Sequence, residues 1–181
     1  MRRGHEHTSR IARAVAVTSA TVAAAVALAA SPASAAEWGI HGAGNPLDDW
    51  WDEQIVSARE QHHPRGNVAA MWQQILWADG YLTWADIDGD FGTKTTAASK
   101  KWQADHGLDA DGLIGRNTWK KASTSNLTLG SEANTLVYWG TGGRKITFKR
   151  PNDPDYWQMQ LGSEWGTLSY DLCTYDKCGG V

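Results

Sequence analysis

The apolar positions of the chain change their spacing near Ser123, from a helical period to a period of two. Before that point, apolar side chains recur three and four residues apart, as on one face of an α-helix. The clearest stripe consists of Val68, Met71, Trp72, Ile75 and Leu76. Together with the terminal signals, this spacing predicts four helices, at residues 45–58, 67–79, 93–106 and 116–123.

The first of these helices is predicted largely from its ends. Asn45 is a favourable N-cap, and Pro46 suits the first helical position, where its missing N–H would have no partner. Pro64 and Gly66 follow and would end the helix. We therefore expect residues 36–66 to be a linker that contains one short amphipathic helix.

After Ser123 the alternation of apolar and polar residues favours strands. Residues 135–139 and 144–148 flank a Gly-rich turn, which is typical of a β-hairpin. Residues 156–161 and 167–173 continue the pattern, so we predict four or five antiparallel strands in residues 124–181. The expected fold class is α+β: a three-helix bundle with a preceding short helix, followed by a small antiparallel β-module with one disulfide.

The first 35 residues have the pattern of a secretory signal peptide. Four arginines precede an uncharged run rich in Ala and Val, and Ala33-Ser34-Ala35 fits a cleavage site. A membrane anchor is the alternative, but the apolar run of 17 residues is short for a span. We expect cleavage after Ala35 and secretion of residues 36–181, with no membrane attachment afterwards.

The two cysteines, Cys173 and Cys178, fit an exported protein. An even number of cysteines in a secreted chain predicts a disulfide, which here would close a loop of four intervening residues. A redox or metal-binding pair would more often be spaced Cys-x-x-Cys, and no partner ligands lie nearby in the sequence.

Charge and composition narrow the class of ligand. The chain has a net charge of -3, and removal of residues 1–35 leaves 13 basic and 19 acidic side chains, a net charge of -6. No basic stripe remains, so a nucleic-acid partner is not expected. Eleven Trp stand against two Phe. Because an indole can pack in a core or stack on a sugar ring, this balance is a weak indication of carbohydrate binding.

One motif occurs twice, 23 residues apart, in residues 88–95 and 111–118. Each copy has the form Asp-Gly-x-apolar-Gly-x-x-Thr. The Asp can accept amide hydrogens of a turn, while the first Gly takes a positive φ. The Thr lies in the first turn of the following helix, where it can satisfy an unpaired amide. The repeat therefore predicts two similar loops side by side on a helical scaffold.

Residues around this repeat carry a resemblance to a known family. The positions concerned are Val68, Met71, Ile75, Gly80-Tyr81, the two repeated motifs, Ala98, Trp102-Gln103, Gly107-Leu108 and Trp119. With them the chain resembles the small peptidoglycan-binding-like helical domain of many bacterial cell-wall proteins. The resemblance implies a domain at residues 67–123 that holds the protein on peptidoglycan, its expected partner. Residues 124–181 resemble no family that we can name.

The candidates for ligand contact lie on or beside the repeated loops: Trp84, Asp88, Asp90, Lys94, Asp111 and Arg116. Trp84 lies in a polar loop off every helical stripe, so it is the best candidate for stacking on a sugar, although packing onto the core is the alternative. Asp88 and Asp111 are expected first of all to form the turns. We expect Trp84 and the two loops to form one shallow groove edge, with the other charged residues on its rim.

No metal ion or other cofactor is expected. Residues 86–90 resemble the start of a calcium loop, but Phe91 stands where that loop needs Gly and Ala97 stands where it needs Glu. The histidines lack the spacing of metalloprotease ligands.

No catalytic residues are predicted. The cysteines are expected to be oxidised and no His follows His106, which disfavours a cysteine peptidase or a zinc amidase. Carboxylates in residues 48–60 are available for a glycosidase, but one short helix does not make a cleft. The sequence favours a monomeric, non-catalytic protein of the cell wall. The alternatives are a small cell-wall hydrolase with its active site in residues 124–181, and a secreted module that binds another protein.

Overall fold

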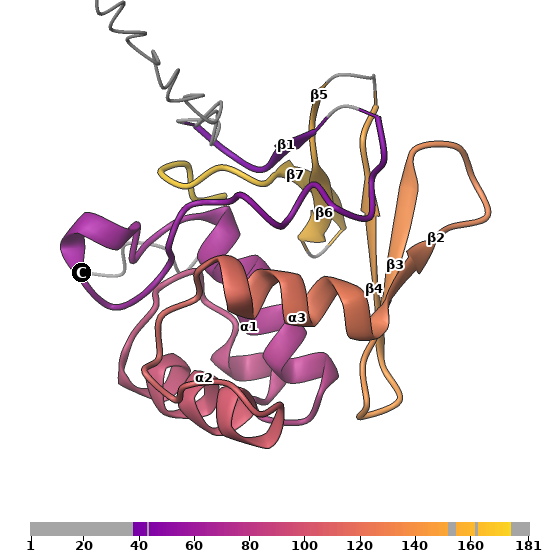
Figure 1. Cartoon of the computed structure of the whole chain (residues 1–181). Coiled ribbons are helices and arrows are strands. Elements are labelled where there is room, and N and C mark those ends of the chain that lie inside the picture. Colours follow the sequence, from indigo (N-terminus) through magenta and orange to yellow (C-terminus); the bar gives the residue numbers. More distant parts are fainter. Residues whose placement is uncertain (1–37, 43, 152–154, 162, 175–181) are drawn as a thin grey trace, which may run out of the picture. The chain divides into compact units, whose positions relative to one another are not determined.

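Three of the four predicted helices are confirmed by the structure, a computed structural model that describes residues 38–42, 44–151, 155–161 and 163–174. They are α1 (Asn67–Ala78), α2 (Thr93–Asp105) and α3 (Arg116–Asn126). Two short 3-10 helices, η1 (Glu60–His62) and η2 (Trp84–Asp86), lie in the connecting loops. Figure 1 shows α1, α2 and α3 packed against one another.

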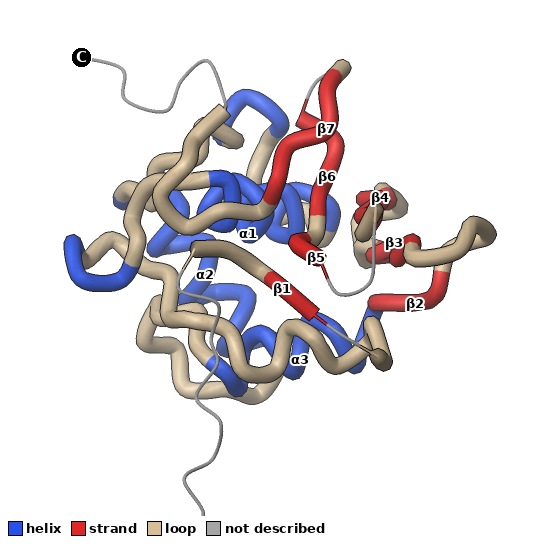
Figure 2. Tube along the Cα trace, turned by 90° about the horizontal axis from the view of Figure 1, so that it is seen from above, coloured by secondary structure: helices blue, strands red, loops and turns tan. Residues whose placement is uncertain are grey.

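The second part of the chain forms the predicted antiparallel sheet, in the order β2-β3-β4-β6-β7. Its strands are β2 (Leu127–Leu129), β3 (Thr135–Trp139), β4 (Lys145–Lys149), β6 (Gln158–Leu161) and β7 (Glu164–Thr167). The hairpin of β3 and β4 pairs Tyr138 with Ile146, and both side chains are buried. A separate two-stranded sheet pairs β1 (His41–Gly42) with β5 (Asp155–Tyr156), which lie side by side in Figure 2.

The predicted helix at residues 45–58 is wrong. The chain there forms turns at residues 46–50 and then runs without regular structure to Val56, which pairs with Ile114. Trp50, Glu53 and Val56 are buried at intervals of three residues, and such a spacing also fits a helix. The turn is favoured because the buried carboxylate of Asp49 accepts hydrogen bonds from the side chains of Arg150 and Trp157. These donors lie far along the chain, so a helix formed from residues 45–58 alone would not have them.

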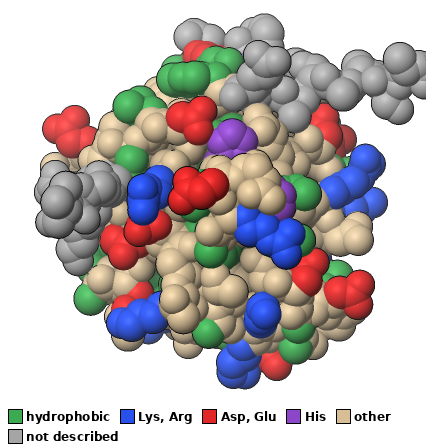
Figure 3. Space-filling view, turned by 90° about the vertical axis from the view of Figure 1, so that its left-hand side faces the viewer, with side chains coloured by type: hydrophobic (Ala, Val, Ile, Leu, Met, Phe, Trp, Pro, Cys, Tyr) green, Lys and Arg blue, Asp and Glu red, His purple; other side chains and the backbone are tan. Residues whose placement is uncertain are grey.

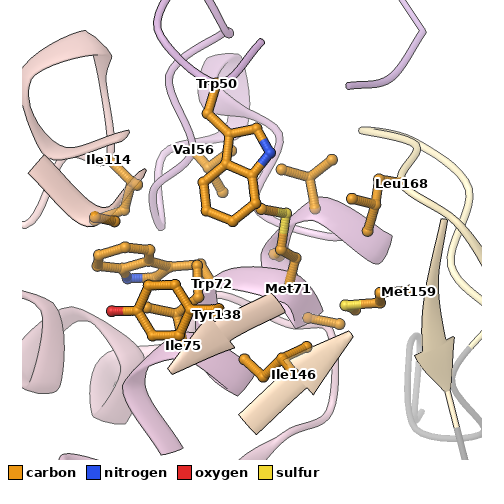
Figure 4. Packing of buried hydrophobic residues seen from close by; sticks show 14 of the residues in the cluster. Trp50, Val56, Met71, Trp72, Ile75, Ile114, Tyr138, Ile146, Met159 and Leu168 are labelled. Carbon is orange, nitrogen blue, oxygen red and sulfur yellow. The ribbon is translucent and has the colours of Figure 1, made fainter. Parts of the chain in front are cut away.

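One hydrophobic core joins the helices, the sheet and the segment before α1. Trp72 of α1 packs edge-on against Trp119 of α3, and Trp119 does the same against Trp50. Figure 4 shows Trp50 and Trp72 in one cluster with Tyr138 and Met159 of the sheet. Ile40, Trp50 and Val56 thus contribute to the core, although a linker was expected at residues 36–66. The boundaries at residues 66 and 123 stay predictions.

The start of α1 depends on the end of the described chain. The first N–H groups of a helix have no partner within the helix. Here the N–H of Asn67 donates to the Leu172 carbonyl and that of Val68 to the Ser169 carbonyl. Gly66 precedes them, and a Cβ at that position would lie 2.1 Å from the Tyr170 carbonyl oxygen. Only glycine therefore lets the C-terminal segment approach the helix closely enough to satisfy it.

Asp79, at the end of α1, connects the helices to the sheet through its buried carboxylate. One oxygen accepts hydrogen bonds from Trp102 of α2 and from the Tyr138 hydroxyl of β3, each at 2.7 Å. The other oxygen accepts the backbone N–H of Thr141 at 2.9 Å. A buried carboxylate that accepts hydrogen bonds from donors of both the helices and the sheet fixes the position of the sheet relative to α1 and α2.

Candidate functional site

The first repeated loop is built around the side chain of Gln73, which reaches it from α1. The Gln73 amide oxygen accepts the backbone N–H groups of Asp88 and Gly89 at 3.0 and 2.8 Å. Its nitrogen donates to the Asp88 carboxylate at 2.7 Å and to the Thr95 hydroxyl at 3.0 Å. Gly89 has φ +74°, as the motif predicts. The Asp, Gly and Thr of the motif are thus explained by the geometry of the turn and by its hydrogen bonds to Gln73.

The second loop uses Gln103 of α2 in the same way. Its amide oxygen accepts the N–H of Gly112 at 2.8 Å, and its nitrogen donates to the Asp111 carboxylate at 3.0 Å and to Thr118 at 3.1 Å. Asp111 also accepts the N–H of Leu113 at 2.8 Å. In each loop one carboxylate oxygen of the Asp is therefore occupied by the turn. This agrees with the expectation that Asp88 and Asp111 act first of all as turn residues.

Each loop borders a separate pocket at the start of the next helix. The pocket before α2, of about 360 Å³, is lined by Asp88, Asp90 and Lys94. The pocket before α3, of about 240 Å³, is lined by Asp111 and Arg116. The structure therefore divides the candidate residues between two pockets, and Trp84 lines neither of them.

Two of the charged candidates, Lys94 and Asp90, lie beside side chains of opposite charge. Lys94 donates to the Asp86 carboxylate at 2.8 Å, and Arg65 lies 3.5 Å from Asp90. Hydrogen bonds from Lys94 and Thr83 hold the pKa of Asp86 well below its usual range. On the face shown in Figure 3, acidic and basic side chains are interspersed and no patch of one sign appears. Sequence reasoning missed Asp86 as the partner of Lys94.

Trp84 lies at a third pocket, on the side of the sheet. It is 51% exposed and packs edge-on against Trp77 of α1, with ring centroids 4.9 Å apart. Both indoles line a pocket of about 290 Å³, together with Gln74, Lys145, Ile146, Thr147 and Gln160. The sugar-stacking candidate thus faces β4 and β6. Trp77 was missed, although its place off the apolar stripe of α1 is a signal that could have found it.

Two acidic side chains that were available for a glycosidase are buried and bonded within the fold. Asp49 accepts hydrogen bonds from Trp157 at 2.8 Å and Arg150 at 3.0 Å, while its burial raises its pKa. Glu53 accepts a hydrogen bond from the Tyr170 hydroxyl, and its burial raises its pKa to about 8. Both carboxylates therefore hold the segment before α1 against the sheet and the C-terminal segment.

The remaining candidates concern metals, membranes and the disulfide. Within the described ranges, no three His, Cys, Asp or Glu side chains gather as metal ligands would. None of the helices in that part of the chain combines the length and apolar character needed for a membrane span. Cys178 and the segment at residues 1–35 lie outside the described residues, so the disulfide with Cys173 and the signal peptide stay predictions.

Comparison with protein families gives a match over the helices. Residues 65–121 match the family model described as "Putative peptidoglycan binding domain". The resemblance found in the sequence is thereby confirmed for this segment. A protein of Kitasatospora aureofaciens, described as "Uncharacterized protein in bpoA1 3'region", is 43% identical over 54 residues. The match covers 30% of this chain and 42% of that protein, so the chain spans less than half the length of this relative. No solved structure matches the chain.

The segment that matches the family model contains both repeated loops, their two glutamines and Trp84. The pocket at Trp84 is nevertheless completed from outside it, because Lys145, Thr147 and Gln160 belong to the sheet. This segment therefore does not supply this pocket by itself.

Proposed function

We propose that this protein is secreted, associates with the cell wall and binds peptidoglycan without cleaving it. The family match over residues 65–121 supports peptidoglycan as the partner. The observation that carries the proposal is the half-exposed indole of Trp84 at the mouth of a pocket. Apolar side chains that gather at one pocket mark binding grooves, and Trp84 packs edge-on against Trp77 at this pocket.

The chemistry of the pocket suits a sugar ring. An indole offers a flat apolar face, and amide and hydroxyl groups can fix the orientation of a ligand by hydrogen bonds. Thr147 and Gln160 provide such groups beside Trp84 and Trp77, while the Gln74 amide donates to the Gln160 backbone carbonyl at 3.1 Å. We therefore place the glycan, and not the stem peptide, at Trp84.

The absence of catalysis is part of the proposal. Asp49 and Glu53 are engaged in packing the fold, which supports a structural role for the most deeply buried carboxylates of the segment before α1. Secretion is supported by the pattern of residues 1–35. A peptidoglycan-binding domain has its ligand outside the cell membrane, which fits the same destination.

Sedimentation with insoluble peptidoglycan tests the proposal. Protein purified from culture medium should sediment with the wall, and Trp84→Ala should bind roughly tenfold more weakly, equivalent to about 1–2 kcal/mol. Trp38→Ala is the matched control, because Trp38 is also exposed, at 42%, and does not line this pocket. Thermal melting of each variant shows whether stability has changed.

Three results would contradict parts of the proposal. If the wild-type protein stays in the supernatant, peptidoglycan binding is wrong. If Trp84→Ala binds and melts like the wild type, the site is wrong. Release of soluble muropeptides by the purified protein would show that it is a hydrolase.

A further inference from the structure

The outer face of the five-stranded sheet carries a group of aromatic and basic side chains. Side chains alternate between the two faces of a strand. In β3 and β4 the buried positions are Leu136, Tyr138, Ile146 and Phe148. The alternate positions lie on the opposite face, where Trp139 pairs with Lys145 across β3 and β4, and Trp165 pairs with Gln160 across β6 and β7.

Two of these outer side chains are exposed tryptophans. Trp139 is 54% exposed and Trp165 is 39% exposed. Each has a lysine over its ring: Lys145 lies 6.0 Å from the centroid of Trp139, and Lys149 lies 4.1 Å from that of Trp165. The indole N–H of Trp139 also donates to the Thr128 hydroxyl at 3.0 Å, which fixes the ring on the sheet.

These tryptophans adjoin the pocket at Trp84. Lys145 and Gln160 line that pocket, and they are the cross-strand neighbours of Trp139 and Trp165. Cross-strand neighbours have their Cβ atoms within about 5.5 Å of each other. Four tryptophans are exposed in the described part of the chain. Trp84 lines this pocket, and Trp139 and Trp165 lie beside it, whereas Trp38 does not line it.

The charge of this face differs from that of the chain. The protein has a net charge of -3, yet the outward-facing positions of β4 include Lys145 and Lys149. Among the described residues, no acidic side chain forms a salt bridge with either lysine. Arg144 lies on the α1 side instead, over the ring of Trp77 and 5.2 Å from its centroid. The outer face therefore combines flat apolar rings with two lysines.

We propose that the outer face of the sheet is a second part of the glycan site, which binds the same peptidoglycan strand that enters the pocket at Trp84. Sugar rings of the strand stack on Trp139 and Trp165, and the lysines attract the carboxylates of its stem peptides. The face is continuous with the pocket, and its charge complements that of the strand. This inference rests on the proposed function and gives the sheet a role in it.

The test uses the full secreted protein and peptidoglycan from which phosphate-bearing wall polymers have been removed. Trp139→Ala and Trp165→Ala should each weaken binding about fivefold to tenfold, and the double variant about 25-fold to 100-fold, if the two contacts are independent. Both side chains are exposed, so the melting temperature should change little. Trp38→Ala again serves as the control and should bind like the wild type. Higher salt should weaken the wild-type protein more than Lys145→Ala or Lys149→Ala.

The outcomes separate this inference from the proposed function. If the wild-type protein and the double variant bind equally well, the sheet is not part of the site, although peptidoglycan binding stands. If the variants lose affinity only for walls that retain their phosphate polymers, the ligand of the sheet is such a polymer and the inference is wrong. If the wild-type protein does not bind stripped peptidoglycan at all, the proposed function and this inference are both wrong.

Discussion

Replacement of Glu53 by glutamine should remove a pH dependence from the stability of the fold. The Glu53 side chain is 7% exposed and accepts hydrogen bonds from the Tyr170 hydroxyl and the His41 backbone. Burial dominates over both contacts and raises its pKa to about 8 from an ordinary value of 4.5. Glutamine keeps the shape and one acceptor oxygen, but it carries no proton that titrates.

The sign of the effect follows from the raised pKa. Between pH 4.5 and about 8 the folded protein keeps a proton on Glu53 that the unfolded chain releases. The free energy of unfolding therefore falls by about 1.4 kcal/mol for each pH unit in this range. The contribution is fully present below pH 4.5 and is lost as the pH rises through 8. Over the whole range it amounts to roughly 5 kcal/mol.

Urea unfolding at several pH values between about 5 and about 9 measures this effect. The quantity to follow is the difference in the free energy of unfolding between the wild type and Glu53→Gln. Asp49 titrates in both proteins, so its contribution largely cancels in this difference. Glu132→Gln is the control, because Glu132 is exposed. A difference that stays constant, within about 1 kcal/mol, from pH 5 to pH 8 would refute the reasoning.

Three further predictions concern the fold and the processing of the chain. Asp79→Ala should lower the free energy of unfolding by roughly 2–5 kcal/mol, because buried donors of Trp102 and Tyr138 lose their acceptor; a loss in urea denaturation below about 1 kcal/mol would contradict this. Secreted protein should gain two alkylated thiols, at Cys173 and Cys178, only after reduction, and the disulfide should contribute on the order of 2–3 kcal/mol; intact mass and urea midpoints measure the two. N-terminal sequencing of protein from the medium should begin at Ala36 or within a residue or two, whereas full-length protein confined to the cytoplasm would exclude the signal peptide.

The local features of residues 65–121 could be predicted because they depend on neighbouring residues. Asp88 and Asp111 form turns as their motif indicates, since the Asp and the positive-φ Gly are adjacent in the sequence. Gln73 and Gln103 could not be assigned to these turns from periodicity. A polar side chain at a buried helical position looks like a break in the apolar stripe, and its partners lie 8 to 22 residues further along the chain.

Features that depend on distant segments were missed or wrong. The expected helix at residues 45–58 gives way to a turn because Asp49 finds Arg150 and Trp157 about a hundred residues away. Trp84 is exposed as the polar loop suggested, but its pocket contains Lys145 and Gln160, which no local pattern links to it. We expected the two loops to share one groove. In the structure each loop is folded around its own glutamine and borders its own pocket.

The pairing of β1 with β5 affects the order in which parts of the protein can fold during synthesis. Residues 39–42 pair with Tyr156, Leu168 and Ser169, so the first and the last described segments of the chain lie together. Contacts over such long sequence separations form late, because a long loop must close before they stabilise anything. During synthesis, the start of α1 and the segment before it must wait for residues 155–172 to emerge from the ribosome. Until those residues have emerged, buried side chains of the segment before α1, such as Ile40, lack part of the surface that covers them, so this part of the core closes last.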